Sequence, residues 1–219
     1  MNVRLGIMLV GSVVALGLQM SRAADEPTLP LHKDDRATLD KIVRRQKLDA
    51  PPTLATRGWP LRAGEKGIRY ASKDNPKYAL TVVCNAEGRV VKLLGNGPLL
   101  SDDSLRLAAA LPELRFVRID HNMAPPKSDV PVSDYSGAGF AALSKSKLEE
   151  VRIGHGFNDE GMKALASIPT LRRVDIVHSK VSDKGLAVLK GHPAIEEFKI
   201  SSQARPQHIT EKSIAVLAT

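Results

Sequence analysis

The sequence is poor in cysteine, in aromatic residues and in long apolar runs, and each shortage excludes a class of protein. One cysteine among 219 residues cannot form an internal disulfide framework, a zinc cluster of cysteines or the paired cysteines of a c-type haem attachment. Aromatic residues make up only 4% of the chain, which argues against a base-stacking surface for single-stranded nucleic acid. With 42% hydrophobic and 26% charged residues, the chain is instead globular in character.

The N-terminal residues have the pattern of a secretory signal peptide. Arg4 precedes an apolar run over residues 5–18, and Ser21 and Ala23 occupy the small-residue positions before a cleavage site. The run is shorter than the roughly 20 residues that a membrane-spanning helix needs. We therefore predict that residues 1–23 are a signal peptide and that the protein is secreted or periplasmic, with no stable membrane insertion after cleavage. An uncleaved anchor is the alternative.

The basic excess is small once it is located along the chain. The full sequence has 32 basic and 24 acidic residues, and two of the arginines belong to residues 1–23. Residues 24–87 carry 12 basic and 9 acidic side chains, and residues 88–219 carry 18 and 15. Such a spread surplus favours solubility and non-specific adhesion over nucleic-acid recognition, so nucleic acid is not an expected partner. Binding to an anionic polymer or to the envelope surface is an alternative function.

An internal repeat with a period of about 24 residues runs through residues 88–219, with one insertion of about 10 residues. Each copy opens with a block whose positions 1, 4 and 6 are apolar. Clear blocks begin at Leu114, Leu148, Leu171 and Ile195, and a weaker copy begins at Val90. We expect each block to form a strand that buries these three positions.

A short helix is expected after each strand. Between the two stands a residue whose side-chain oxygen can cap a helix N-terminus, and these residues are Ser101, Ser136, Asn158, Ser182 and Thr210. Prolines then end several of the helices, at Pro112, Pro169 and Pro193. One unit of strand, turn and helix cannot bury its own apolar face, so stacked units must share a continuous core.

These blocks and helix starts resemble the leucine-rich repeat family in its ribonuclease-inhibitor-like form, which is common in secreted bacterial proteins. A typical helix start here is Ser182-Asp183-Lys184-Gly185-Leu186. The resemblance implies an α/β solenoid: a short curved arc with a parallel sheet on its concave side and helices on its convex side, usually used to bind another macromolecule. The departures are Gly95 at the third apolar position, residues 145–147 where a Leu-Pro turn is expected, and an insertion at residues 123–135.

Residues 24–87 are expected to form an N-terminal helix and an α+β capping region ahead of a domain of about five repeats at residues 88–219. Residues 35–48 have the apolar spacing of an amphipathic helix. Residues 79–84 have the composition of a strand, and a turn then leads to the first repeat strand at residues 89–94.

Positions 3 and 5 of the strand blocks are expected to project from the concave sheet, because alternate strand residues share a face. They are the candidate partner-binding residues: Phe116, Glu150, Arg173 and Glu197 at position 3, and Arg118, Arg152, Asp175 and Lys199 at position 5. Their charges alternate from strand to strand, which predicts ion pairs across the sheet. Such pairs could hold the sheet together or meet a mixed-charge protein partner.

Histidine recurs at position 8 of three successive units, as His121, His155 and His178. A row of imidazoles could bind zinc or copper, or act as a pH-sensitive patch. However, side chains that project in parallel about 4.8 Å apart do not converge on one ion. Metal binding is therefore the weaker hypothesis, and no cofactor is expected.

No motif for catalysis is present: the sequence has no G-x-S-x-G, H-E-x-x-H or phosphate-loop pattern. Cys84 closes an apolar strand and is predicted to be a core thiol rather than a nucleophile. We predict a non-catalytic protein that binds another protein through its concave sheet and through the rim loop at residues 123–135, which prolines stiffen.

Overall fold

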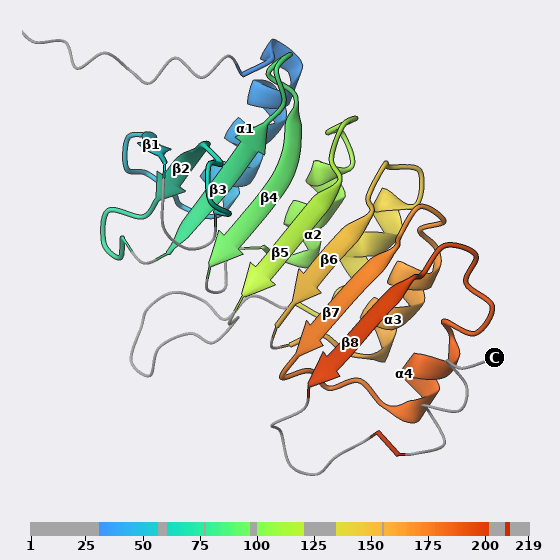
Figure 1. The fold of residues 1–219 in the computed structure, drawn as a ribbon. Helices are drawn as coiled ribbons and strands as arrows, with labels where there is room; N and C mark the ends of the chain where they lie inside the picture. The colour runs from blue at the N-terminus through green and yellow to red at the C-terminus, as the bar shows by residue number, and fades with distance from the viewer. Residues whose placement is uncertain are drawn as a thin grey trace, which may run out of the picture.

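The computed structural model describes residues 31–56, 61–76, 78–96, 100–120, 135–154, 156–201 and 209–210. Over these residues the chain forms an α/β fold with one eight-stranded sheet in the order β1 to β8. Pairing is antiparallel from β1 to β4 and parallel from β4 to β8. In Figure 1 the helices lie side by side behind the strands. The opposite face of the sheet, here called the open face, carries no helix among the described residues.

Three predicted segments lie outside the described residues. They are the signal peptide, residues 123–134 of the insertion, and the last helix after Thr210.

The predicted N-terminal helix is α1 (Lys33–Arg45), which begins and ends slightly earlier than expected. His32 sets its start, because Nδ1 of that side chain accepts the Asp34 N–H at 3.4 Å. Lys47 sets its end with a left-handed φ of 53°, and the Leu48 N–H donates to the Val43 carbonyl at 3.1 Å. This reversal is a Schellman-type cap, which the apolar spacing of residues 35–48 does not reveal.

The N-terminal region contributes three strands to the sheet, and the first repeat strand follows them. The predicted strand is β3 (Ala79–Cys84), and the first repeat strand is β4 (Val90–Asn96). The turn between them is closed by the Gly88 N–H, which donates to the Asn85 carbonyl at 3.0 Å. Two strands that the sequence analysis did not predict, β1 (Thr53–Ala55) and β2 (Gly67–Ala71), extend the sheet beyond β3.

Four further strands follow in register. They are β5 (Phe116–Asp120), β6 (Glu150–Ile153), β7 (Arg173–Val177) and β8 (Glu197–Ser201). The expected burial of positions 1, 4 and 6 is confirmed in the units of β5, β6 and β7, where these side chains are at most 1% exposed. In the unit of β8, the equivalent side chains Ile195, Phe198 and Ile200 are only partly buried. Among the described residues, this strand is the last in the sheet and pairs with β7 alone.

The helices after the strands are α2 (Asp102–Ala108), η1 (Ala138–Leu143), α3 (Asp159–Ala166) and α4 (Asp183–Ala187). The predicted caps Ser101, Asn158 and Ser182 each accept a backbone N–H at the start of a helix. The second unit differs, because η1 is a 3₁₀ helix that starts after Gly137, not after Ser136. Gly137 has a φ of 90°, and a Cβ there would lie 2.3 Å from the Phe157 ring. Only glycine fits both constraints.

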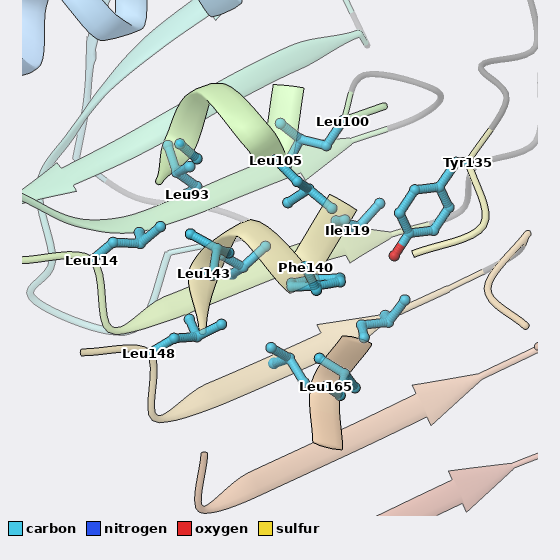
Figure 2. Packing of buried hydrophobic residues seen from close by; sticks show 14 of the residues in the cluster. Leu93, Leu100, Leu105, Leu114, Ile119, Tyr135, Phe140, Leu143, Leu148 and Leu165 are labelled. Atoms are coloured by element: carbon cyan, nitrogen blue, oxygen red, sulfur yellow. The ribbon is translucent and has the colours of Figure 1, made fainter. Parts of the chain in front are cut away.

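The core fills the space between the sheet and the helices, as Figure 2 shows for Leu93, Leu105 and Phe140. Phe140 and Phe157 pack edge to face with ring centroids 6.4 Å apart. The departure at Gly95 has a packing reason. A Cβ at this position would lie 3.0 Å from Cδ1 of Leu100, so the leucine occupies the space that a third strand hydrophobe would need.

Aspartates at the helix starts join each unit to the next. Asp159 accepts the N–H and the hydroxyl of Ser182 at 2.8 and 2.6 Å, and Asp183 accepts the same two groups of Thr210 at 2.8 and 2.7 Å. Asp102 accepts both groups of Ser136 in the same way. These bonds satisfy the N–H groups that a helix start leaves without an intrahelical partner.

Replacing Gly185 with alanine is expected to destabilise the protein by about 1–3 kcal/mol, because a small residue is required where two units meet. Its Cβ would lie 2.2 Å from Oδ1 of Asp159. Urea unfolding of Gly185→Ala, Asp159→Ala and the double variant measures this contact. The double variant should be more stable than the sum of the two losses predicts, since removal of the carboxylate removes the clash. Strict additivity would contradict the packing described here.

Candidate binding surface

The eight candidate residues from the sequence all lie on the open face, in two rows that cross the parallel strands. The first row is formed by Lys92, Phe116, Glu150, Arg173 and Glu197, each in register with the next. The second row is formed by Arg118, Arg152, Asp175 and Lys199, and the residue of β4 in register with them, Leu94, is buried at 1% exposure. Alternation along each strand places both rows opposite the buried positions 4 and 6. The structure therefore brings the candidates together as one surface.

The predicted ion pairs across the sheet are confirmed at two places. Glu150 accepts hydrogen bonds from Nη2 and Nε of Arg173 at 2.8 and 3.0 Å. These bonds raise the pKa of Arg173 above its ordinary value, since they favour the charged guanidinium. In the second row, Arg152 Nε lies 3.5 Å from Oδ2 of Asp175.

The alternation is incomplete, however. Among the described residues, Glu197 forms no ion pair across the strands; it accepts a hydrogen bond from Lys199 of its own strand, which lowers the pKa of Glu197 and raises that of Lys199. Arg118 is in register with Arg152, so two residues of the same charge are neighbours in the second row. The prediction of alternating signs is therefore wrong at β5 and β6, where the register is the one that the blocks predict but position 5 is arginine in both units.

The segment from residue 61 to residue 66 also reaches the first row, a contact that the sequence analysis missed. Glu65 pairs with Lys92, and Nη2 of Arg62 lies 3.4 Å from Oε1 of Glu150. Glu65 and Lys92 are 27 positions apart in the chain, and Arg62 and Glu150 are 88 positions apart. No motif in residues 61–66 indicates these contacts. The Lys92 ammonium also lies 5.7 Å from the centre of the Phe116 ring, a cation–π distance.

The Glu65 contact predicts a pH dependence of stability. Burial opposes ionisation of Glu65, but the bonds from Lys92 and from the Arg62 N–H outweigh it and lower the pKa below 4.5. A lowered folded-state pKa adds stability above the unfolded value, and this stability is lost as the pH falls through the folded value. Urea unfolding at pH 7 and pH 3 should show a smaller loss for Glu65→Gln than for the wild type. An equal loss would show that the contact does not form in solution.

A further charged ladder runs along the rim where the strands begin. Arg115 pairs with Glu149, and Arg172 pairs with Glu196. The residues occupy position 2 of successive blocks, and their signs do alternate from unit to unit. The regular repeat was the signal that could have found this ladder. Such exposed pairs contribute only about 0–1 kcal/mol each to stability.

The histidine row is described only in part. His178 is at the end of β7 with a left-handed φ of 52°, whereas His121 and His155 lie outside the described residues. The described part of the chain holds no group of three or more metal-ligating side chains. The metal hypothesis stays a prediction that titration of the protein with zinc would test.

Cys84 is half-buried and packs against the core. Burial, with a smaller contribution from the charge of Asp35, raises the pKa of its thiol to about 11. At neutral pH it is therefore a protonated thiol, which is a poor nucleophile.

No protein-family model and no curated protein matches the sequence. Within the residues that the structure describes, no helix is long and apolar enough to cross a membrane. A function for this chain is therefore argued from the open face itself.

Proposed function

We propose that this chain is a secreted or periplasmic leucine-rich repeat protein of the ribonuclease-inhibitor-like type, which binds another protein non-covalently and has no catalytic activity. The observation that carries the proposal is the open face. The parallel strands carry two registered rows that are charged except at Phe116 and at the buried Leu94, and the helices lie on the other face. The concave sheet of a solenoid is an extended surface of this kind.

The charge pattern favours a protein as partner over an anionic polymer. The two rows place acidic Glu150, Asp175 and Glu197 among basic residues, so a uniform polyanion would meet repulsion at several strands. A folded protein surface can instead match both signs. The rim loop at residues 123–135 is a second contact in this proposal, because insertions in solenoids gather on one face, which is often the binding face.

A matched pair of charge swaps tests the proposal. Glu197→Lys with Lys199→Glu keeps both the ion pair and the net charge of the open face but exchanges the signs. Glu160→Lys with Lys163→Glu does the same for an exposed pair on α3, on the helical side. A chain lacking residues 123–134 tests the rim loop separately and keeps Tyr135, which is buried in the core.

Affinity capture from an envelope extract, followed by a titration with the captured protein, gives the readout. We expect the open-face swap to weaken binding about tenfold or more, since like charges then face each other across the interface. The helical-side swap should leave affinity unchanged. Equal affinity of both swaps and the wild type would contradict the proposal.

A further inference from the structure

We propose that β8 is a docking edge for a second copy of this chain, which adds its own β8 in an antiparallel arrangement and joins the two sheets into one. The inference goes beyond the proposed function, because it concerns the edge of the sheet and not the surface of its open face. Among the described residues, β8 pairs with β7 alone. A strand at the edge of a sheet is a template for pairing with another chain.

The backbone of β8 is oriented for this pairing. The Glu197 N–H donates to the Arg172 carbonyl at 3.0 Å, and so points toward β7. Backbone groups alternate in direction along a strand, so the N–H and C=O groups of Phe198 and Ile200 point away from β7. A two-fold axis at Phe198 lets the two copies of this residue exchange both hydrogen bonds, as in a hydrogen-bonded antiparallel pair.

The charges of β8 are self-complementary about this axis. Glu197 of one copy lies opposite Lys199 of the other, and the symmetry repeats the pair on the other side of the axis. These are non-hydrogen-bonded positions, at which opposed side chains come closest. Lys199 is 65% and Glu197 is 45% exposed, and the two already pair within the strand. In the dimer each charge therefore lies beside two charges of opposite sign.

Apolar side chains on the helical side of β8 give the two copies a reason to associate. Ile195, Phe198 and Ile200 are only partly buried, whereas the equivalent residues in the units of β5, β6 and β7 are at most 1% exposed. The two copies of Phe198 lie opposite each other in the dimer and continue the core across the axis. Pairing thus removes from water the apolar surface that this last unit leaves exposed.

The other edge of the sheet, β1, is a poorer site. This strand has three residues and directly follows Pro51 and Pro52, and short strands and prolines are features that block pairing at an edge. The strand β8 has five residues and no proline. Among the described strands, β8 is therefore the edge that favours association, and pairing of one edge with itself gives a closed two-fold dimer rather than a filament.

Sedimentation velocity over a range of concentrations, with two single charge reversals, tests the proposal. Glu197→Lys places two lysine pairs face to face across the axis, and Lys199→Glu places two glutamate pairs there. We expect the wild type to dimerise with a micromolar Kd, and each single reversal to raise that Kd about tenfold or more, because like charges directly opposite each other destabilise a sheet. The matched controls are Glu160→Lys and Lys163→Glu on the exposed surface of α3, which should change the Kd less than about twofold.

An equimolar mixture of the two single β8 reversals is the decisive sample. One chain then carries lysine at both positions and the other carries glutamate at both, so the mixed pair is complementary although neither variant is complementary to itself. We expect the mixture to dimerise, which a loss of folding in either variant would not allow. An equimolar mixture of the two α3 reversals controls for general attraction between the chains. The double variant Glu197→Lys with Lys199→Glu keeps the complementarity and should dimerise like the wild type.

Three results would overturn the inference: a wild type that stays monomeric at about 100 µM, single reversals that dimerise as tightly as the wild type, or a mixture of the β8 reversals that stays monomeric. Oligomers that grow beyond the dimer would also contradict it, because they would indicate head-to-tail association. The double variant separates the two proposals, since it should weaken partner binding at the open face but leave the dimer unchanged. A chain that does not dimerise would leave the proposed function to its own test.

Discussion

Replacing Arg89 with alanine is expected to lower the free energy of unfolding by about 3–5 kcal/mol, because it leaves a fully buried carboxylate without its ion-pair partner. Asp35 on α1 has no exposed surface. Its carboxylate accepts Nη1 of Arg89 at 2.8 Å and the N–H of Val90 at 2.7 Å. This clamp fixes the N-terminal helix to the first parallel strand, and therefore fixes the cap to the repeats.

Chemical unfolding of Arg89→Ala, Asp35→Ala and the double variant measures the clamp. The double variant should lose less than the sum of the single losses, since it leaves no buried charge without a partner. Arg44→Ala, on the exposed side of the same helix, is the control and should cost less than about 0.5 kcal/mol. A comparable small loss for Arg89→Ala would show that α1 is not held by this pair.

Replacing Asp102 with alanine is expected to cost about 2–4 kcal/mol, the largest loss in the row of aspartates. Its carboxylate accepts four hydrogen bonds: Oδ2 from the N–H and hydroxyl of Ser136 at 3.0 and 2.9 Å, and Oδ1 from the N–H groups of Gly137 and Gly139 at 3.0 and 2.9 Å. Without it, the partly buried N–H groups at the start of η1 lose their acceptor.

The comparison with Asp159→Ala tests this account, since Asp159 accepts two hydrogen bonds from the next unit, not four. Its loss should be about half that of Asp102→Ala. Asp102→Asn should be intermediate, because an amide offers one acceptor oxygen. Equal losses for the two alanine variants, by thermal or urea unfolding, would contradict the assignment of Asp102 as the main link.

Periodicity predicted the local structure well, because each unit buries the same positions. The apolar pattern placed the strands at β5, β6 and β7, their buried positions and three of the helix caps. The sequence analysis missed what depends on contacts between distant residues: the aspartate row, the Asp35 clamp, and the strands β1 and β2. The start of the 3₁₀ helix after Gly137 also escaped prediction, because the close approach of Phe157 to Gly137 is a contact between two units.

For the candidate surface too, the sequence pattern predicted the local arrangement of side chains but not the contacts between distant residues. Strand alternation alone predicted which eight side chains share the open face. It did not reveal the Arg62 and Glu65 contacts, which depend on where the β1–β2 connection folds. The like charges at β5 and β6 could have been predicted, because the blocks already place Arg118 and Arg152 at position 5 of successive units and the observed register agrees.

The central claim is that the open face is the binding surface, and site-specific photo-crosslinking tests it most directly. A benzoylphenylalanine in place of Asp175, on the open face, is compared with one in place of Lys184, exposed on α4. The account predicts that position 175 crosslinks to the partner and that position 184 does not. Crosslinking from position 184 alone, or equally from both positions, would contradict it.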